Sequence, residues 1–444
     1  MSDNTSNISI DQATAGGGTE GFCGIWDFSK GGVASSRIEA LSSRGFSMRS
    51  VSPGLHLSSK GFEVHESGNG SSRGCLVFFA GRLDNLEGLE SFTSGGGEAG
   101  DICEIFEKRG VECFRKLEGD FTLLVFDKEE NRLFLVRDFA GTRPIHYTAT
   151  PGGFVFGSSI ATILKISGRP PEPNLDHLAW YMLRRSVVDD SATFFEQVYS
   201  VPTSHYAEIL DSRIEIKRYW DFEPDRREEA GSYDSFVVRF RELFENAVRK
   251  RLVDHPGIQV SGGLDSSSIY AVAKRSEMGG RLYAISYIAP VGSAGYEENY
   301  LERLEEDFRD RVERVPAPPP SLCHNIGGQV RAMEAPFLQY DYILDMFMTA
   351  RSHGCQTLLS GFMGDQMMID DSYLVDFVRR GDFRTVLAHF KTISASFANF
   401  GAPLSRMYRQ TTRELASSLC PQKIKRLVRR VRPRPARGWF TSSF

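Results

Sequence analysis

The chain has 444 residues, of which 25% are charged and 41% hydrophobic, with a net charge of −4 and a pI near 6.2. This balance is typical of a soluble globular protein of two or three domains and gives no overall attraction to nucleic acid or membranes. The sequence holds no apolar run of about 18 residues, as a membrane span needs, and its polar N-terminus lacks the apolar segment of a secretory signal. We therefore expect a cytoplasmic protein. Seven cysteines without CxxC spacing predict reduced thiols and neither a disulfide framework nor a zinc site.

Residues 1–20 are rich in Ser, Asn and Gly and predict a flexible tail. The next stretch, 21–220, consists mainly of short apolar runs separated by glycine or charged turns, which predict packed antiparallel sheets. The expected strands include 75–80, 121–127, 132–136 and 153–157, and helices are expected at 102–109 and 175–184.

A charged linker is expected at 221–231, and beyond it the pattern changes. Helical and strand-like segments alternate, which predicts an α/β domain with a parallel sheet over 232–444. The expected helices are 235–252, 266–278 and 300–308, and the expected strands are 258–260, 282–288 and 357–359. A basic cluster at 423–437 lacks interleaved aromatic residues, so we interpret it as a solvated helix and not as a nucleic-acid site.

The most informative segment is Val260-Ser261-Gly262-Gly263-Leu264-Asp265-Ser266-Ser267-Ser268, which follows an expected strand and opens an expected helix. Glycines let a backbone approach phosphate closely, and the N–H groups of a helix N-terminus attract its charge. Asp265 would repel a phosphate unless a cation bridges the two, which indicates Mg²⁺. A Walker A loop is excluded because its Gly-Lys-Ser/Thr ending is absent. A glycine turn with an Asp-Ser helix cap is the alternative.

This segment resembles the pyrophosphate loop (PP-loop) of the asparagine synthetase family, which includes β-lactam synthetase and lasso-peptide cyclase. A second segment, Ser360-Gly361-Phe362-Met363-Gly364-Asp365, resembles the family's SGxGxDE motif, although Met363 and Gln366 depart from it. The resemblance implies cleavage of ATP between its α and β phosphates, with Mg²⁺ held by Asp265 and Asp365. The implied ATP-binding residues are Val260, Ser261, Gly262, Gly263, Leu264, Asp265, Ser266, Ser267, Ser360 and Gly361.

A segment around Glu334 resembles the family's glutamate-containing segment ahead of the substrate pocket. The resemblance makes Glu334 the residue that deprotonates or orients the attacking nitrogen. Glu298 is a weaker candidate for the same pocket, and its alternative interpretation is the start of a surface helix.

The first domain resembles the N-terminal-nucleophile (Ntn) glutaminase domain of the same family over residues 22–220, which implies an αββα sandwich. The resemblance places Cys23 at the nucleophile and Gly81 and Asp101 in the glutamine pocket. However, Cys23 is preceded by 22 residues, so its nitrogen is an amide and not a basic amine. Ala80 and Arg82 replace an amide donor and a carboxylate of the family pattern. Losing one oxyanion donor costs about 10²–10³ in rate, so we expect a glutaminase-like domain without glutaminase activity.

The family's synthetase domain continues to an Arg-x-Pro-Phe-Leu-Asp segment and a later lysine, whereas this chain ends at Phe444. We therefore expect either a fragment or a shortened paralogue. The leading functional prediction is an ATP-dependent, AMP-forming amide synthetase that activates aspartate or a peptide carboxylate for attack by ammonia or an amine. A precursor peptide or partner protein is a further expected partner. The alternatives are a glutamine-hydrolysing asparagine synthetase in asparagine biosynthesis and a catalytically silent scaffold that binds ATP or a peptide.

Overall fold

The computed structural model describes residues 21–29, 33–41, 45–67, 74–85, 97–184, 190–222, 232–253, 255–276, 282–289, 291, 298–316, 340–362, 364 and 374–398. The chain divides into two compact units. The first contains residues 1–255, 287–293 and 315–357, and the second contains 256–286, 294–314 and 358–444. Among the described helices, none is long and apolar enough to cross a bilayer.

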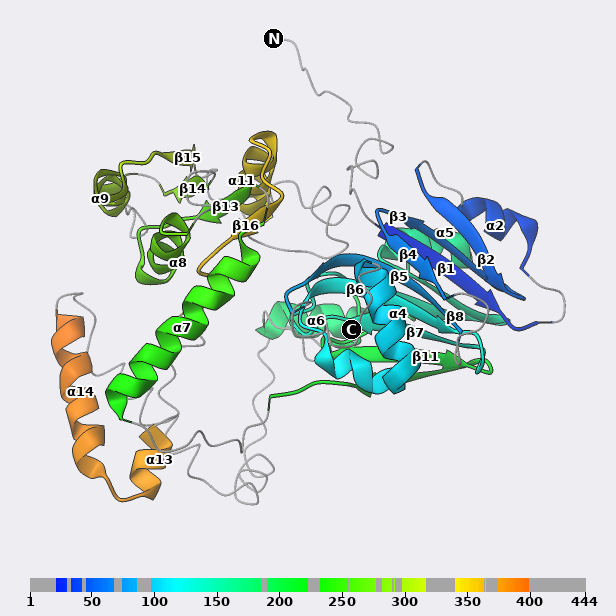
Figure 1. Ribbon diagram of the computed structural model, residues 1–444, viewed down its shortest axis with the longest axis horizontal. Coiled ribbons are helices and arrows are strands. Elements are labelled where there is room, and N and C mark those ends of the chain that lie inside the picture. Colours follow the sequence, from blue (N-terminus) through cyan, green and yellow to red (C-terminus); the bar gives the residue numbers. More distant parts are fainter. Residues whose placement is uncertain are drawn as a thin grey trace, which may run out of the picture. The chain divides into compact units, whose positions relative to one another are not determined.

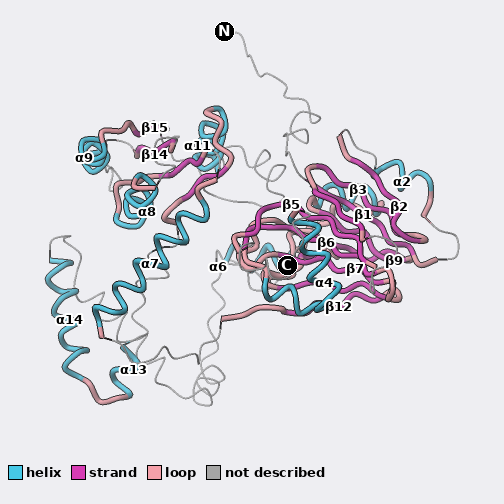
Figure 2. Tube along the Cα trace, viewed as in Figure 1, coloured by secondary structure: helices cyan, strands magenta, loops and turns pink. Residues whose placement is uncertain are grey.

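The first unit contains two six-stranded antiparallel sheets (Figures 1 and 2). The first sheet has the order β10 (Tyr199–Ser200), β8 (His146–Thr150), β9 (Gly153–Gly157), β1 (Gly21–Asp27), β3 (Leu55–Lys60) and β2 (Ser47–Ser52). The second has the order β12 (Arg213–Arg218), β11 (His205–Leu210), β7 (Arg132–Arg137), β6 (Gly119–Asp127), β5 (Cys75–Leu83) and β4 (Glu63–Glu66).

The side chains of β1 point alternately to the two faces of the first sheet, and their contacts show how the layers are stacked. Phe22 and Trp26 belong to the cluster between the two sheets, which also contains residues of β3, β5 and β6. Cys23 and Ile25 point to the opposite face. There they pack with residues of β9 and of the helices α2 (Ser35–Leu41) and α5 (Ile160–Ser167).

On the outer face of the second sheet, α4 (Glu98–Arg109) and the 3₁₀ helix η2 (Gly110–Lys116) complete another apolar cluster. Figure 1 shows α4 against the second sheet and α2 and α5 beside the first. The layer order is therefore helix, sheet, sheet, helix, as the family resemblance implies. The helix α4 begins four residues before the predicted start. Its first turn follows a glycine run and contains Gly100, a weak helix former, so the sequence pattern does not indicate it.

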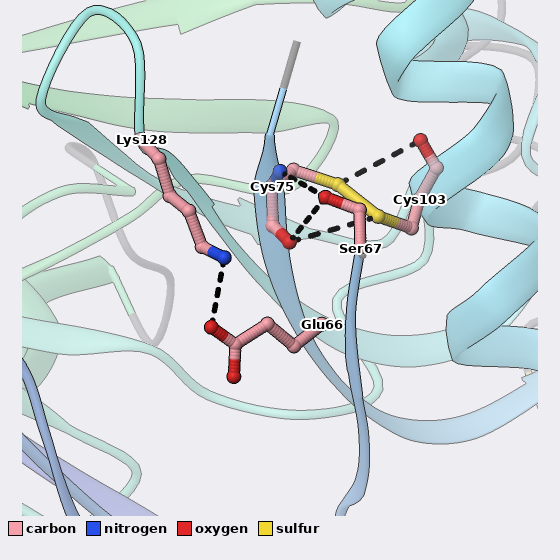
Figure 3. The surroundings of a disulfide bond; sticks show 5 residues. All are labelled: Glu66, Ser67, Cys75, Cys103 and Lys128. Atoms are coloured by element: carbon pink, nitrogen blue, oxygen red, sulfur yellow. Dashed lines mark hydrogen bonds and ion pairs between the residues drawn. A yellow bond between two sulfur atoms is a disulfide. The ribbon is translucent and has the colours of Figure 1, made fainter. Parts of the chain in front are cut away.

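A disulfide joins Cys75 at the start of β5 to Cys103 in α4 (Figure 3), so the prediction of only reduced thiols is wrong. The two cysteines are separated by 28 residues and belong to no spacing motif. Only the packing of α4 on β5 brings their sulfur atoms together. Close by, the Ser67 hydroxyl accepts a hydrogen bond from the Cys75 amide at 2.8 Å, and Lys128 pairs with Glu66 at 2.7 Å.

The second unit contributes to a four-stranded sheet of order β15 (Val312–Pro316), β14 (Tyr283–Ile288), β13 (Pro256–Gln259) and β16 (Thr357–Leu359). β13 and β14 are parallel, as the alternating pattern predicts. The connecting helices α8 (Leu264–Lys274) and α9 (Glu298–Phe308) pack together through the rings of Tyr270 and Phe308 at 5.2 Å. Among the described residues, the remaining helices of the first unit are α6 (Leu175–Arg184), α7 (Tyr233–Arg251) and α11 (Tyr340–Ser352), and those of the second are α13 (Leu374–Arg379) and α14 (Phe383–Ala398).

Candidate functional site

The segment between β13 and α8 is a tight loop at the carboxyl end of a parallel strand. Val260 is fully buried, and its amide donates to the carbonyl of Ile285 on β14 at 2.8 Å, which extends the strand pairing by one residue. Gly262 has φ 85°, a conformation that favours glycine. Gly263 precedes α8 and offers no side-chain cap, so the first-turn N–H groups lack the partner that Ser or Asp would supply.

Two serine hydroxyls hold the loop in shape. The buried Ser266 hydroxyl accepts from the amide of Ser261 at 3.0 Å, and the two hydroxyl oxygens also lie 3.0 Å apart. The Gly263 amide donates to the Ser261 hydroxyl at 3.2 Å. By contrast, the hydroxyl of Ser267 is buried and has no hydrogen-bond partner among the residues that the structure describes. Ser261 and Ser266 therefore organise the loop.

The second predicted segment meets this loop at Asp265. A Cβ atom on Gly361 would lie 2.7 Å from the Ser266 amide nitrogen and 3.0 Å from the Asp265 Cβ. A Cβ on Gly364 would lie 2.4 Å from a carboxylate oxygen of Asp265. Glycine is thus required at both positions for the backbone to approach α8. Segments almost one hundred residues apart in the sequence form one cradle around the Asp265 carboxylate.

The donor set at this cradle fits Mg²⁺. Among the residues that the structure describes, Asp265 has neither an ion pair nor a hydrogen-bond partner, and it is partly exposed. A carboxylate at a helix N-terminus beside an anion-binding loop supplies the oxygen ligand that Mg²⁺ prefers. Asp365 follows Gly364 directly in the sequence, but it lies outside the described residues, as does Glu334. Their predicted roles stay predictions.

Glu298 lies at the start of α9, in agreement with the surface-helix interpretation. Its carboxylate accepts from the guanidinium of Arg314 at 2.8 and 3.0 Å. Arg314 also binds Glu305, and these hydrogen bonds are the main reason that the pKa of Glu305 is lowered. This ion-pair cluster connects the first and second turns of α9 to β15. The Glu298 carboxylate is therefore already paired with Arg314.

The helix α8, which follows the loop, is anchored by a polar contact. The sequence does not indicate this contact. Asp310 accepts from the Tyr270 hydroxyl at 2.6 Å and from the Lys274 ammonium at 2.9 Å. Burial alone would raise the pKa of Asp310, but the hydrogen bonds from Tyr270 and Lys274 outweigh it, so that this pKa is lowered. Tyr270 is fully buried on α8. The contact therefore fixes the helix that carries the loop.

The position predicted for the glutaminase nucleophile is inside a central strand. Cys23 pairs with Ser58 of β3 and with Gly157 of β9, and Phe22 before it donates through its amide to the Ser158 hydroxyl at 3.1 Å. The Cys23 side chain is 2% exposed, and burial raises its pKa to about 12. A thiol in this environment carries almost no thiolate at neutral pH.

At the positions predicted for the glutamine pocket, Gly81 and Arg82 make close contacts within the domain, whereas Asp101 has a buried oxygen that makes no hydrogen bond with the described residues. Gly81 has φ 137° and lies so close to Asp120 that a Cβ would be 2.1 Å from its carbonyl oxygen. Arg82 pairs with Asp84 at 2.8 Å and with Asp120 at 3.4 Å. Asp101, in the first turn of α4, is 8% exposed, and within the described part of the chain its buried Oδ1 atom has no hydrogen-bond partner. Arg82 thus places positive charge where the family pattern has a carboxylate.

Two family models match the chain. A glutamine amidotransferase domain matches residues 84–220, and an asparagine synthase domain matches residues 239–433. Among solved structures, one described as the allosteric regulatory enzyme of purine biosynthesis aligns with 77% of this chain and 89% of its own, at 12% identity and a TM-score of 0.33.

Curated relatives match part of the chain. Asparagine synthetase [glutamine-hydrolyzing] 3 of Bacillus subtilis is 31% identical over 194 residues, which are 42% of this chain and 30% of that protein. Amidase chry2 of Gibberella zeae is 31% identical over 176 residues, 38% of this chain and 25% of that protein. Putative asparagine synthetase [glutamine-hydrolyzing] 2 of Methanocaldococcus jannaschii is 26% identical over 245 residues, which are 52% of this chain and 46% of that protein. The matched segments thus span less than half the length of these relatives.

The order of the two matched domains agrees with the order of the two expected domains, and the asparagine synthase match includes both segments that meet at Asp265. The chain therefore combines a segment that matches a glutamine amidotransferase domain with one that matches an asparagine synthase domain, and asparagine synthetases are among its relatives.

Proposed function

We propose that this protein is an ATP-dependent amide synthetase that binds ATP at the loop Ser261–Asp265 and activates a carboxylate as its acyl-adenylate. The observation that carries the proposal is the approach of Gly361 and Gly364 to Asp265. Two segments that resemble motifs of one family converge on a carboxylate at the open N-terminus of α8. Such a terminus favours phosphate, and the carboxylate favours the accompanying cation.

The reaction follows from these groups. The substrate carboxylate attacks the α-phosphate of ATP and displaces pyrophosphate, giving an acyl-adenylate. An amine or ammonia then attacks the acyl carbon, AMP leaves, and the nitrogen loses a proton, for which Glu334 is the candidate acceptor. Mg²⁺ bound by Asp265 and Asp365 would neutralise charge on the departing pyrophosphate. The loop amides and the α8 N-terminus hold the phosphates in place.

The nitrogen source in this proposal is free ammonia or a substrate amine, and the glutaminase-like domain does not hydrolyse glutamine. Cys23 is a buried internal residue of β1 with a raised pKa, and Arg82 opposes binding of the glutamine ammonium group. These positions thus supply neither the basic α-amine of a glutaminase nor the carboxylate that binds the ammonium group of glutamine. Ammonia release from glutamine by the chain, or by a form trimmed to begin at Cys23, would contradict this part of the proposal.

The test of the synthetase proposal is ATP–pyrophosphate exchange with Mg²⁺ over a panel of aspartate and candidate peptides. We expect exchange that depends on one carboxylate substrate and that Asp265→Ala abolishes. Glu306→Gln, an exposed carboxylate on α9, is the matched control and should leave exchange unchanged. ATP binding without exchange for any carboxylate would instead favour the silent scaffold.

A further inference from the structure

A cluster of potential metal ligands lies in the first unit, away from Asp265. It consists of Cys75 on β5 and of Cys103 and Glu107 on α4, whose sulfur and carboxylate oxygen atoms all lie within 4.8 Å of one another. Cys103 and Glu107 are four residues apart, so they share one face of the helix. That face packs on β5, which supplies the third donor (Figure 3).

Glu107 places a carboxylate oxygen in apolar surroundings. Its Oε1 atom is buried and has no hydrogen-bond partner among the described residues. Cys75 and Cys103 are 0% and 1% exposed, within the apolar cluster between α4 and the second sheet. A carboxylate oxygen without a donor in such a place costs free energy. The disulfide carries no charge and does not compensate it, whereas a cation would.

The donor types restrict which cation can bind. Thiolates favour zinc and other borderline or soft cations over Mg²⁺ and Ca²⁺, which prefer oxygen ligands. With bonds of about 2.3 Å to sulfur and about 2.1 Å to oxygen, ligand atoms of a tetrahedral zinc are roughly 3.6–3.8 Å apart. The three donors need only a small rearrangement to reach such distances once the sulfurs are no longer bonded. A water molecule would complete the coordination.

We propose that reduction of the Cys75–Cys103 bond creates a site at which Cys75, Cys103 and Glu107 bind one zinc-class divalent cation. A dithiol reductant supplies two electrons and two protons, becomes a disulfide itself, and leaves two thiols. The cation then replaces the two thiol protons, which pass to solvent. The disulfide and the metal site exclude each other, so the redox state of this pair determines whether the cation binds.

The experiment uses Cd²⁺ as the probe, because cadmium–thiolate bonds give an ultraviolet charge-transfer band. The full chain is reduced with a dithiol, freed of reductant without air, and titrated with Cd²⁺ by absorption and calorimetry. We expect one equivalent with the thiolate band in the reduced protein and none at this site in the oxidised protein. Cys103→Ser should remove that equivalent. Glu107→Gln should weaken binding roughly tenfold or more, since even outer-shell partners contribute 10–100-fold.

Two control variants distinguish this site from others. Glu104→Gln changes a carboxylate on the same helix that pairs with Lys108, and Cys113→Ala removes a thiol of the same apolar cluster that is not in a disulfide. Both should retain the equivalent. Because Glu107→Gln leaves both cysteines in place, it tests the proposal even where Cys103→Ser does not fold. No thiolate band in the reduced protein, or unchanged binding in Glu107→Gln, would overturn the proposal.

Discussion

Gly361→Ala tests whether the contact between the two loop segments forms the nucleotide site. The added Cβ would lie 2.7 Å from the backbone nitrogen of Ser266 and 3.0 Å from the Asp265 Cβ. These atoms belong to the first turn of α8, so the strain cannot be relieved by rotating a side chain. Overpacking of this kind costs about 1–3 kcal/mol. If the segments separate to relieve it, ATP binding should weaken by roughly 5–150-fold, at about 1.4 kcal/mol per factor of ten.

ATP affinity is measured by calorimetry with Mg²⁺, and thermal unfolding of the same samples shows whether the variant is folded. Gly74→Ala is the control, since the nearest atom to its added Cβ, at 3.3 Å, belongs to the flexible Lys128 side chain. It should bind ATP like the wild type. A folded Gly361→Ala variant with wild-type ATP affinity would refute the reasoning, because the close approach of the segments would then be irrelevant to the nucleotide.

Three further predictions concern the contacts around the sites. Asp310→Asn removes the ion pair with Lys274 and should lower the free energy of unfolding by about 1–2 kcal/mol in urea titrations at pH 7. Because the folded-state pKa of Asp310 is lowered, its stabilisation is present above the unfolded pKa of about 3.9 and lost as pH falls through the folded value, so the two proteins should converge in acid. Replacing Cys75 and Cys103 by Ala should cost roughly 3.5 kcal/mol under oxidising conditions, from the loop entropy of a 28-residue separation, and unchanged urea midpoints would exclude a formed disulfide. Cys23, with a pKa of about 12, should resist alkylation at pH 8 until the chain unfolds, as followed by mass spectrometry; rapid labelling of the folded protein would show that the thiol is accessible.

Much of the local structure can be predicted from the sequence. The strand at 153–157 and the helix at 175–184 are predicted at their observed bounds, and α8 and β14 within a few residues. Apolar residues recur every second position along a half-buried strand and every third or fourth along a helix, so hydrophobic periodicity identifies such elements. The loop from Ser261 to Asp265 is equally local, because its glycines and serines shape it through contacts spanning at most five residues.

Contacts between distant segments are different, because they depend on which elements pack together. No spacing in the sequence indicates that Cys75 and Cys103 form a disulfide; the packing of α4 on β5 decides it. Which side of the first sheet receives the Cys23 thiol follows from the stacking of two sheets on one face and helices on the other. The family pattern anticipates that Gly361 serves the same site as Asp265, but only the tertiary structure shows that a single added carbon would separate them.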